Sequence, residues 1–375
     1  MNTNFRLFLI AVLAVVITSH ITWKHSLASG LDYTFEHYKI EFKKSYRTEA
    51  EHKIREMIYN ESLKKVNEIN SNKSYTWKAA INHLSDRIPS ELDSLMGKNR
   101  DMHFFNSRKT SKNILKNNTP FLKQLPTHVD WREQGVTTPV KNQGSCGSCW
   151  AFSVSAVLES HIAINNSEKS VLVSPQELVD CVENPHKCGG TGGCSGATQE
   201  LGFEYIQNNG ISLNNEYPYF AKEGKCQNRE HKRAVSIGSF SKLPENDYNS
   251  LLQAVAVNGP VAISVAASEW SFYDSGVFNS FCGTTVNHAV TLEGYGTDEN
   301  GNDYWLVRNS WGEGWGEKGY IRVMREKSAK DVVCDIDKNP HDGSACEGGP
   351  SEVTVCGHCG ILSDSSIPLD VKLIK

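Results

Sequence analysis

The stretch that decides the fold of this chain is Gln143-Gly144-Ser145-Cys146-Gly147-Ser148-Cys149-Trp150. Apolar residues recur three or four positions apart over residues 150–164, which predicts a helix that begins directly after Cys149. The positive end of the helix dipole would then face the sulfur. A thiol attacks a carbonyl as the thiolate, so its pKa must fall from the ordinary value of about 8.5. The stretch therefore predicts a nucleophilic cysteine at a helix N-terminus.

Three other residues could serve this cysteine, two of them far along the sequence and one, Gln143, in the same stretch. His288 could supply an imidazolium that stabilises the thiolate as a charge pair. Asn309 could accept a hydrogen bond from the other imidazole N–H and fix the orientation of the ring without adding charge. The side-chain amide of Gln143 could donate to a developing oxyanion, beside the backbone N–H of Cys149. These residue types are those of a thiol-dependent acyl-transfer site.

Because these blocks occur in this order, the chain resembles the papain family of cysteine peptidases, and cathepsin L within it. The resemblance runs from about residue 33 to residue 368. It implies that Cys149 attacks the scissile carbonyl and that His288 pairs with it and protonates the leaving amine. It also implies that Asn309 orients His288 and that Gln143 helps to form the oxyanion hole. Trp311 resembles the residue that shields the Asn–His hydrogen bond from water, and we place it with the substrate-binding residues.

The order of the predicted elements agrees with this resemblance. A second helix start is predicted at Ser174-Pro175-Gln176-Glu177, with serine as the cap and proline in the first turn. Short apolar runs predict strands over residues 260–265, 289–294, 304–308 and 319–324. Helices that come first and strands that come later predict an α+β fold with a cleft between two lobes. The resemblance implies a papain-like fold with a helical left lobe, a β-barrel-like right lobe and an N-terminal helical propeptide.

The chain is predicted to have three parts. Residues 7–17 are an unbroken apolar run, too short to span a bilayer, which favours a cleaved signal peptide over residues 1–23 rather than an uncleaved anchor. Residues 24–124 are the expected inhibitory propeptide, ending in a polar linker over residues 98–123 where proteolysis is expected. Residues 125–375 are the expected peptidase domain, released by cleavage near Leu125.

The expected partners follow from charge and from the resemblance. The net charge is −4 and no dense block of Lys or Arg occurs, which argues against nucleic acid as a partner. No stable membrane insertion is expected once the signal peptide is removed. The resemblance implies protein and peptide substrates, inhibition by the chain's own propeptide, a monomeric state, and no cofactor or metal. The expected location is the secretory pathway, with a lysosome, a digestive vacuole or the extracellular space as the destination.

The prosegment also resembles that of the cathepsin L-like peptidases. Residues 49–70 carry apolar residues at helical spacing, which predicts a helix. The residues at the positions of the family's helix motif are Glu51, Arg55, Tyr59, Ser62, Val66 and Asn70, of which three match. A second motif is represented by Ala80, Asn82, Leu84 and Asp86, with two looser matches. The resemblance implies that this segment fills the cleft in the reverse direction until it is removed.

The eleven cysteines all lie from Cys146 onward, and in an oxidising lumen this odd number leaves at least one thiol unpaired. The resemblance implies the bridges Cys146–Cys194, Cys181–Cys226 and Cys282–Cys359. Beyond Cys149, four remain that allow three connectivities: Cys188, Cys334, Cys346 and Cys356. Two of these, Cys334 and Cys346, lie in residues 327–355, a long insertion relative to papain that we expect to be a loop.

The resemblance also implies a pocket for the substrate residue two positions before the scissile bond, called P2. The implied substrate-binding residues are Gly196, Ala197, Thr198, Gln199, Ser264, Val286, Ala289 and Asp364. Ala197 stands where the family has a glycine. Asp364 is expected at the pocket floor, where it could pair with a basic side chain, so Arg is expected at P2 as well as Leu or Phe. No His-rich loop that would block the cleft is evident, which favours internal cleavage.

Three other classes of protein remain as alternatives. Cys146 and Cys149 form a C-x-x-C motif, which in another fold would indicate a thiol–disulfide oxidoreductase. A structural zinc site is a second alternative, because zinc prefers the ligand types of the set Cys356, His358 and Cys359 with Cys334 and Cys346 upstream. A non-catalytic binding protein of the same fold would be expected to lack Cys149, His288 or Gln143, and this chain retains all three.

Overall fold

The computed structural model describes residues 33–97, 125–166 and 171–374. The signal peptide and the polar linker predicted above lie outside these residues. The helices are α2 (Phe35–Glu41), α3 (Glu49–Ser71), α4 (Pro89–Leu95), α5 (Cys149–Asn166), α6 (Pro175–Cys181), α7 (Gln199–Asn209) and α8 (Tyr248–Val257), with short 3₁₀ turns η1 (Pro340–Asp342) and η2 (His358–Gly360). The strands are β1 (Trp77–Ala79), β2 (Val129–Asp130), β3 (Val235–Ser236), β4 (Ser239–Lys242), β5 (Val261–Val265), β6 (Tyr273–Phe278), β7 (His288–Thr297), β8 (Asp303–Arg308), β9 (Tyr320–Met324), β10 (Cys334–Asp337), β11 (Val353–Cys356), β12 (Ser365–Leu369) and β13 (Lys372–Leu373).

The chain divides into two compact units, with the boundary inside α3 after residue 61. In the first unit, α2 and the first part of α3 pack through an aromatic cluster. The rings of Phe35, Tyr38 and Tyr59 lie within 6.0 Å of one another by their centroids, and all three side chains are buried. The helix predicted over residues 49–70 is present as α3.

The helical part of the second unit consists mainly of α5, α6 and α7. Helix α5 is buried on nearly all sides, because apolar Trp150, Val154 and Leu158 and the small serines between them all face packed neighbours. The predicted second helix is α6, and the side chain of Ser174 caps it by accepting a hydrogen bond from the backbone N–H of Glu177 at 3.0 Å. Both helices begin within a residue of their predicted positions.

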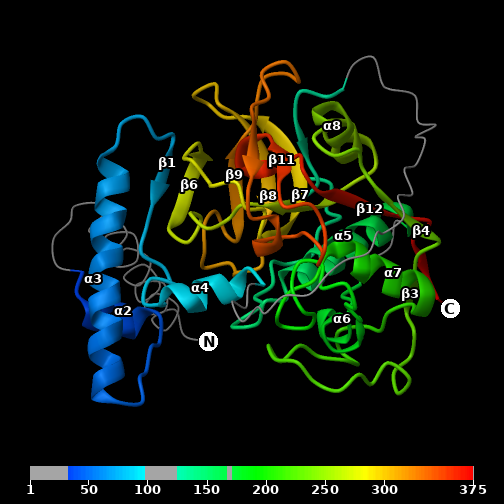
Figure 1. Cartoon of the computed structure of the whole chain (residues 1–375), viewed down its shortest axis with the longest axis horizontal. Helices are drawn as coiled ribbons and strands as arrows, with labels where there is room; N and C mark the ends of the chain where they lie inside the picture. The colour runs from blue at the N-terminus through cyan, green and yellow to red at the C-terminus, as the bar shows by residue number, and fades with distance from the viewer. Residues whose placement is uncertain (1–32, 98–124, 167–170, 375) are drawn as a thin grey trace, which may run out of the picture. The chain divides into compact units, whose positions relative to one another are not determined.

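The β part of the second unit is one large sheet accompanied by two small two-stranded sheets, β10-β11 and β13-β3. The strands of the large sheet run in the order β1-β6-β9-β8-β7-β5-β12-β4, with β2 paired to β7. The four predicted strands are β5, β7, β8 and β9, all of which lie in this sheet. Figure 1 shows α5, α6 and α7 grouped together beside this sheet. The prediction of an α+β fold, with helices first and strands later, is confirmed.

The prosegment contributes the edge strand of this sheet. Strand β1 pairs antiparallel with β6, placing Trp77 opposite Gly276. Figure 1 shows the two strands side by side. A Cβ at Gly276 would lie 2.5 Å from the backbone oxygen of Thr76, and φ there is +91°, so glycine permits this close approach. The prosegment is therefore joined to the peptidase part by backbone pairing, as in β-strand addition.

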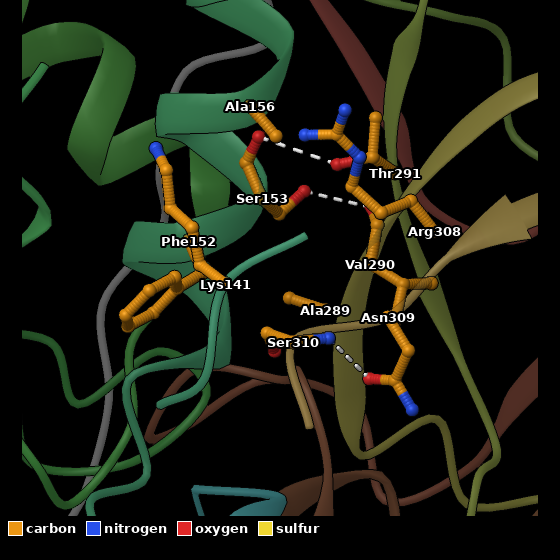
Figure 2. Close-up of a pocket in the computed structure, with 10 residues that line it drawn as sticks. All are labelled: Lys141, Phe152, Ser153, Ala156, Ala289, Val290, Thr291, Arg308, Asn309 and Ser310. Atoms are coloured by element: carbon orange, nitrogen blue, oxygen red, sulfur yellow. Dashed lines mark hydrogen bonds between the residues drawn. The ribbon is translucent and has the colours of Figure 1, made fainter. Parts of the chain in front are cut away.

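The two lobes meet where α5 packs against β7. The hydroxyl of Ser153 donates to the backbone oxygen of Val290 at 2.7 Å, and both residues are buried. Figure 2 shows this contact, with Asn309 and Ser310 on the segment that follows β8. Because α5 begins at Cys149 and β7 begins at His288, this packing places the starts of two elements from different lobes close to each other.

The insertion is partly a regular hairpin, so the expectation that it is a loop was incomplete. Strands β10 and β11 pair antiparallel, and Cys334 and Cys356 are both register partners and disulfide partners. This bridge closes the base of the hairpin. The sequence did not indicate the hairpin, because alternation of polar and apolar residues is hard to recognise in strands this short. Within the described residues, no helix combines the length and apolar character needed to cross a membrane.

Candidate active site

Cys149 and His288 line one pocket between the two lobes. Cys149 is the first residue of α5 and His288 is the first residue of β7, and both are buried. Backbone N–H groups of Ala289, Trp150 and Cys149 itself lie within hydrogen-bonding reach of the sulfur and stabilise a negative charge there. The first turn of α5 therefore presents its free N–H groups to the nucleophile, as the sequence predicted.

Asn309 fixes the imidazole of His288. The Oδ1 atom of Asn309 lies 2.8 Å from Nε2 of His288 and also accepts a hydrogen bond from the backbone N–H of Ser310 at 2.7 Å. Since a backbone N–H can only donate, Oδ1 is the acceptor and Nε2 must carry the proton. In a neutral imidazole, Nδ1 is then the nitrogen left to accept a proton. The ring of Trp311 covers this pair, with its centroid 5.0 Å from that of His288.

Gln143 is held by three hydrogen bonds and donates to the prosegment. Its Oε1 accepts from the hydroxyl of Ser310 at 2.6 Å, and its Nε2 donates to the backbone oxygen of Cys146 at 2.9 Å. The same Nε2 donates to the backbone oxygen of Leu95 at 2.7 Å. The amide expected to bind an oxyanion thus binds a carbonyl of the prosegment.

The prosegment backbone continues past Leu95 between two glycines of the peptidase part. A Cβ built on Gly147 would lie 2.6 Å from Cα of Gly97, and one built on Gly196 would lie 2.5 Å from the backbone oxygen of Gly97. Larger residues at either position would therefore collide with the chain lying there. Ala197 lines the adjacent pocket.

The pocket beside the nucleophile contains most of the predicted substrate-binding residues. Gly196, Ala197, Thr198, Gln199, Ser264, Val286 and Ala289 line it, as do Cys149 and His288. The sequence did not indicate that Met96, Gly97, Gly189, Asn287, Gly343 and Ser344 also line it. Of these, Gly343 and Ser344 come from the insertion, for which no periodicity or motif signalled a contact with the site.

Two family models match the sequence. One, for papain family cysteine proteases, covers residues 125–343, and the other, for the cathepsin propeptide inhibitor domain, covers residues 35–92. The chain belongs to the papain family of cysteine proteases. Like other members with this inhibitor domain, it carries a propeptide.

Relatives and solved structures agree with this assignment. The chain is 39% identical to the thiol protease SEN102 of Hemerocallis sp. over 74% of this chain and 77% of that protein. It is 47% identical to the oryzain beta chain of Oryza sativa subsp. japonica over 57% of this chain and 46% of that protein. It therefore spans about half the length of some curated relatives. The structure of a recombinant stem bromelain precursor superposes with a TM-score of 0.73 and 31% identity, covering 89% of this chain and 97% of that one.

The ionisation of Cys149 and His288 in this member of the papain family is governed by burial. Burial raises the pKa of the Cys149 thiol to about 11, against the smaller opposing effect of the three backbone N–H groups. Burial lowers the pKa of His288 to about 4, opposed by its hydrogen bond to Asn309. With the prosegment over the site, a neutral thiol and a neutral imidazole are favoured near pH 7.

The position of Asp364 differs from the prediction. Its carboxylate accepts a hydrogen bond from the hydroxyl of Ser264 at 2.6 Å and forms an ion pair with Lys242 at 3.1 Å. Asp364 thus lies behind Ser264, which lines the pocket, and its charge is already compensated. Burial, followed by the charge of Asp364, raises the pKa of nearby Glu200 and favours its neutral form. The sequence missed Lys242 because the strand that carries it lies far from Asp364 in the chain.

The cysteines are paired except at the nucleophile. The described residues include all eleven, and among them Cys149 alone is free. The structure forms the three bridges implied by the resemblance, and it joins Cys188 to Cys346 and Cys334 to Cys356. Cys146 is bonded to Cys194 rather than to Cys149, which does not support an oxidoreductase dithiol. The sulfurs of the candidate zinc cluster are all in disulfides and are not available as thiolate ligands.

Proposed function

We propose that this protein is a cysteine endopeptidase made as an inactive precursor, with Cys149 as the nucleophile and His288 as its proton partner. One observation carries the proposal. The Nε2 of Gln143, the donor suited to an oxyanion, donates a hydrogen bond to the backbone oxygen of Leu95. The two residues that follow, Met96 and Gly97, line the pocket beside Cys149. The prosegment therefore occupies the position that a substrate carbonyl needs. Removing it frees the donor and the thiol together.

After removal of the prosegment, water reaches the site and the penalty for charge falls. The proton of the thiol moves to Nδ1 of His288, and the resulting thiolate–imidazolium pair is stabilised by the N–H groups at the start of α5. The thiolate attacks the scissile carbonyl, and the oxyanion accepts hydrogen bonds from Gln143 and from the backbone N–H of Cys149. The imidazolium protonates the leaving amine, and water hydrolyses the acyl-enzyme.

We propose that the P2 pocket prefers apolar side chains. Ala197, Val286 and Ala289 line it, and Met96 of the prosegment, which is apolar and buried, lies in the same pocket. We propose that Arg is disfavoured at P2, because Lys242 pairs with Asp364 and would repel a second cation.

The proposed parts of the chain are the signal peptide (1–23), the inhibitory propeptide (24–124) and the peptidase domain (125–375). The family match that begins at residue 125 supports cleavage near Leu125. The five disulfides and the apolar N-terminal run support a route through the secretory pathway to a lysosome, a digestive vacuole or the cell exterior. The proposed state is a monomer whose partners are peptide substrates and its own propeptide.

The test is processing of the purified precursor at acidic pH, followed by digestion of a long peptide blocked at both ends. We expect cleavage at internal bonds, and loss of cleavage in the Cys149→Ser and His288→Ala variants. A Cys149→Ser variant that still cleaves, when processed by added wild-type enzyme that is then removed, would refute the assignment of the nucleophile. Release of end residues alone from an unblocked peptide would refute internal cleavage.

A further inference from the structure

The insertion crosses from the β lobe to the helical lobe. It leaves the large sheet after β9 and returns to it at β12, while the disulfide from Cys346 ends at Cys188, between α6 and α7. The bridge therefore joins segments 158 positions apart that belong to different lobes. The other bridge of the insertion, Cys334–Cys356, lies within its own hairpin.

Backbone hydrogen bonds fix the insertion to both walls of the P2 pocket. On the β-lobe side, the N–H of Ser344 donates to the backbone oxygen of Val286 at 2.9 Å. On the helical side, the N–H of Gly189 donates to the backbone oxygen of Ala345 at 3.2 Å. Gly189, Val286 and Ser344 all line the pocket. The insertion therefore forms part of the pocket wall.

Two further features tighten this contact. A Cβ at Gly343 would lie 2.1 Å from the backbone oxygen of Val286, so the absence of a side chain lets the insertion approach the wall. Across the disulfide, the N–H of Glu347 donates to the backbone oxygen of His186 at 2.9 Å, and its carboxylate pairs with Lys187 at 3.3 Å. The exposed ion pair adds little by itself, but the disulfide removes the freedom of the segment to move away.

We infer that residues 343–346 form a disulfide-fixed wall of the P2 pocket and limit the size of the P2 side chain. This inference rests on the proposed peptidase function. In an unclamped pocket between two lobes, a larger side chain can be accommodated by displacement of a loop. Here the wall is tied to both lobes, so a bulky aromatic residue must displace a covalently held segment.

The test compares two variants that each lose one disulfide of the insertion. Cys188→Ser/Cys346→Ser frees the wall, and Cys334→Ser/Cys356→Ser is the matched control that leaves it tied to Cys188. Both are produced as full precursors, processed, and titrated with iodoacetamide so that rates refer to active sites. The kcat/KM values are then measured on peptides that differ only at P2, carrying Val, Leu, Phe or Trp.

We expect the wild-type enzyme and the control to prefer Leu to Trp by the same factor, within about twofold. Freeing the wall is expected to raise the Trp-to-Leu ratio roughly tenfold, a size typical for one or two methylene groups in an apolar pocket. A second variant keeps both disulfides: Ser344→Phe adds bulk to the wall and is expected to shift preference from Leu toward Val. If residues 343–346 limit the P2 side chain, freeing them should shift the preference toward larger P2 residues and Ser344→Phe should shift it toward smaller ones. If the disulfide only stabilises the fold, neither the Trp-to-Leu nor the Val-to-Leu ratio of kcat/KM should change.

Unchanged P2 ratios in both Cys188→Ser/Cys346→Ser and Ser344→Phe, with full active-site titration, would overturn the inference and leave the peptidase function intact. Equal shifts in Cys188→Ser/Cys346→Ser and the disulfide control would also overturn it, because the effect would then be general loosening. Absence of hydrolysis by the processed wild-type enzyme would overturn the proposed function itself, and this inference with it.

Discussion

Replacement of Asn82 by Ala should release the prosegment from the active site more often. The side chain of Asn82 is buried, its Nδ2 donates to the backbone oxygen of Ser271 at 2.8 Å, and its Oδ1 accepts from the N–H of Leu84 at 2.8 Å. The first bond ties the prosegment to the peptidase part, and the second holds the turn that presents it. Leaving a buried acceptor unpaired costs about 1–3 kcal/mol. Since 1.4 kcal/mol is a tenfold change, a loss of about 2 kcal/mol raises the open fraction roughly 30-fold.

The assay is the rate at which iodoacetamide alkylates Cys149 in the intact precursor at neutral pH, followed by mass spectrometry. The thiol reacts only while the prosegment is displaced, so the rate reports the open fraction. The control is Ser71→Ala, which removes a local hydrogen bond to the backbone oxygen of Glu68 at the end of α3, in the same prosegment, without touching the peptidase part. Equal alkylation rates for Asn82→Ala and the wild-type precursor would refute the view that this segment controls access to the nucleophile.

Two other predictions concern charge. Because burial raises the pKa of Cys149 to about 11 and lowers the pKa of His288 to about 4, the precursor should show no thiolate absorbance at 240 nm between pH 5 and 9, relative to Cys149→Ser. The processed enzyme should show this absorbance, and an absorbance of equal size in both forms would contradict a neutral thiol and imidazole in the precursor. Replacement of Lys242 by Met should leave the carboxylate of Asp364 without its cation behind Ser264, and should raise the ratio of kcat/KM for Arg to that for Leu at P2 about tenfold. The control is Lys242→Arg, which keeps the cation. An unchanged ratio in Lys242→Met would show that Asp364 does not act on the pocket.

The elements that hold the nucleophile could be predicted because their signals are local. The helix after Cys149 shows a repeat of three to four residues, and the cap at Ser174 is readable from four consecutive residues. The four proposed catalytic positions were predicted from residue types whose order resembles that of the papain family. The structure places these four together, with the geometry described above.

The surroundings of the pocket could not be predicted because their contacts join distant segments. Cys188 and Cys346 were known only as members of a set of four cysteines with three possible pairings, and nothing in their neighbours favoured one of them. The expectation for Asp364 was incomplete for a related reason. The pattern placed an acid near the pocket, but the cation that compensates it, Lys242, comes from a strand whose position becomes known only once the sheet order β5-β12-β4 is known.

In the proposed mechanism, Gln143 serves both inhibition by the prosegment and catalysis. Its side chain is fully buried, so an unpaired amide N–H in the precursor would cost free energy. The carbonyl of Leu95 supplies the missing acceptor at 2.7 Å, and the hydroxyl of Ser310 holds the amide in the orientation it needs for catalysis. The donor is therefore already oriented before any substrate arrives, which is the condition for oxyanion stabilisation without reorganisation. The hydrogen bond from Gln143 to Leu95 also holds the following Gly97 between Gly147 and Gly196. A prosegment that offered Gln143 a different acceptor would lack this placement and would protect the thiol less well.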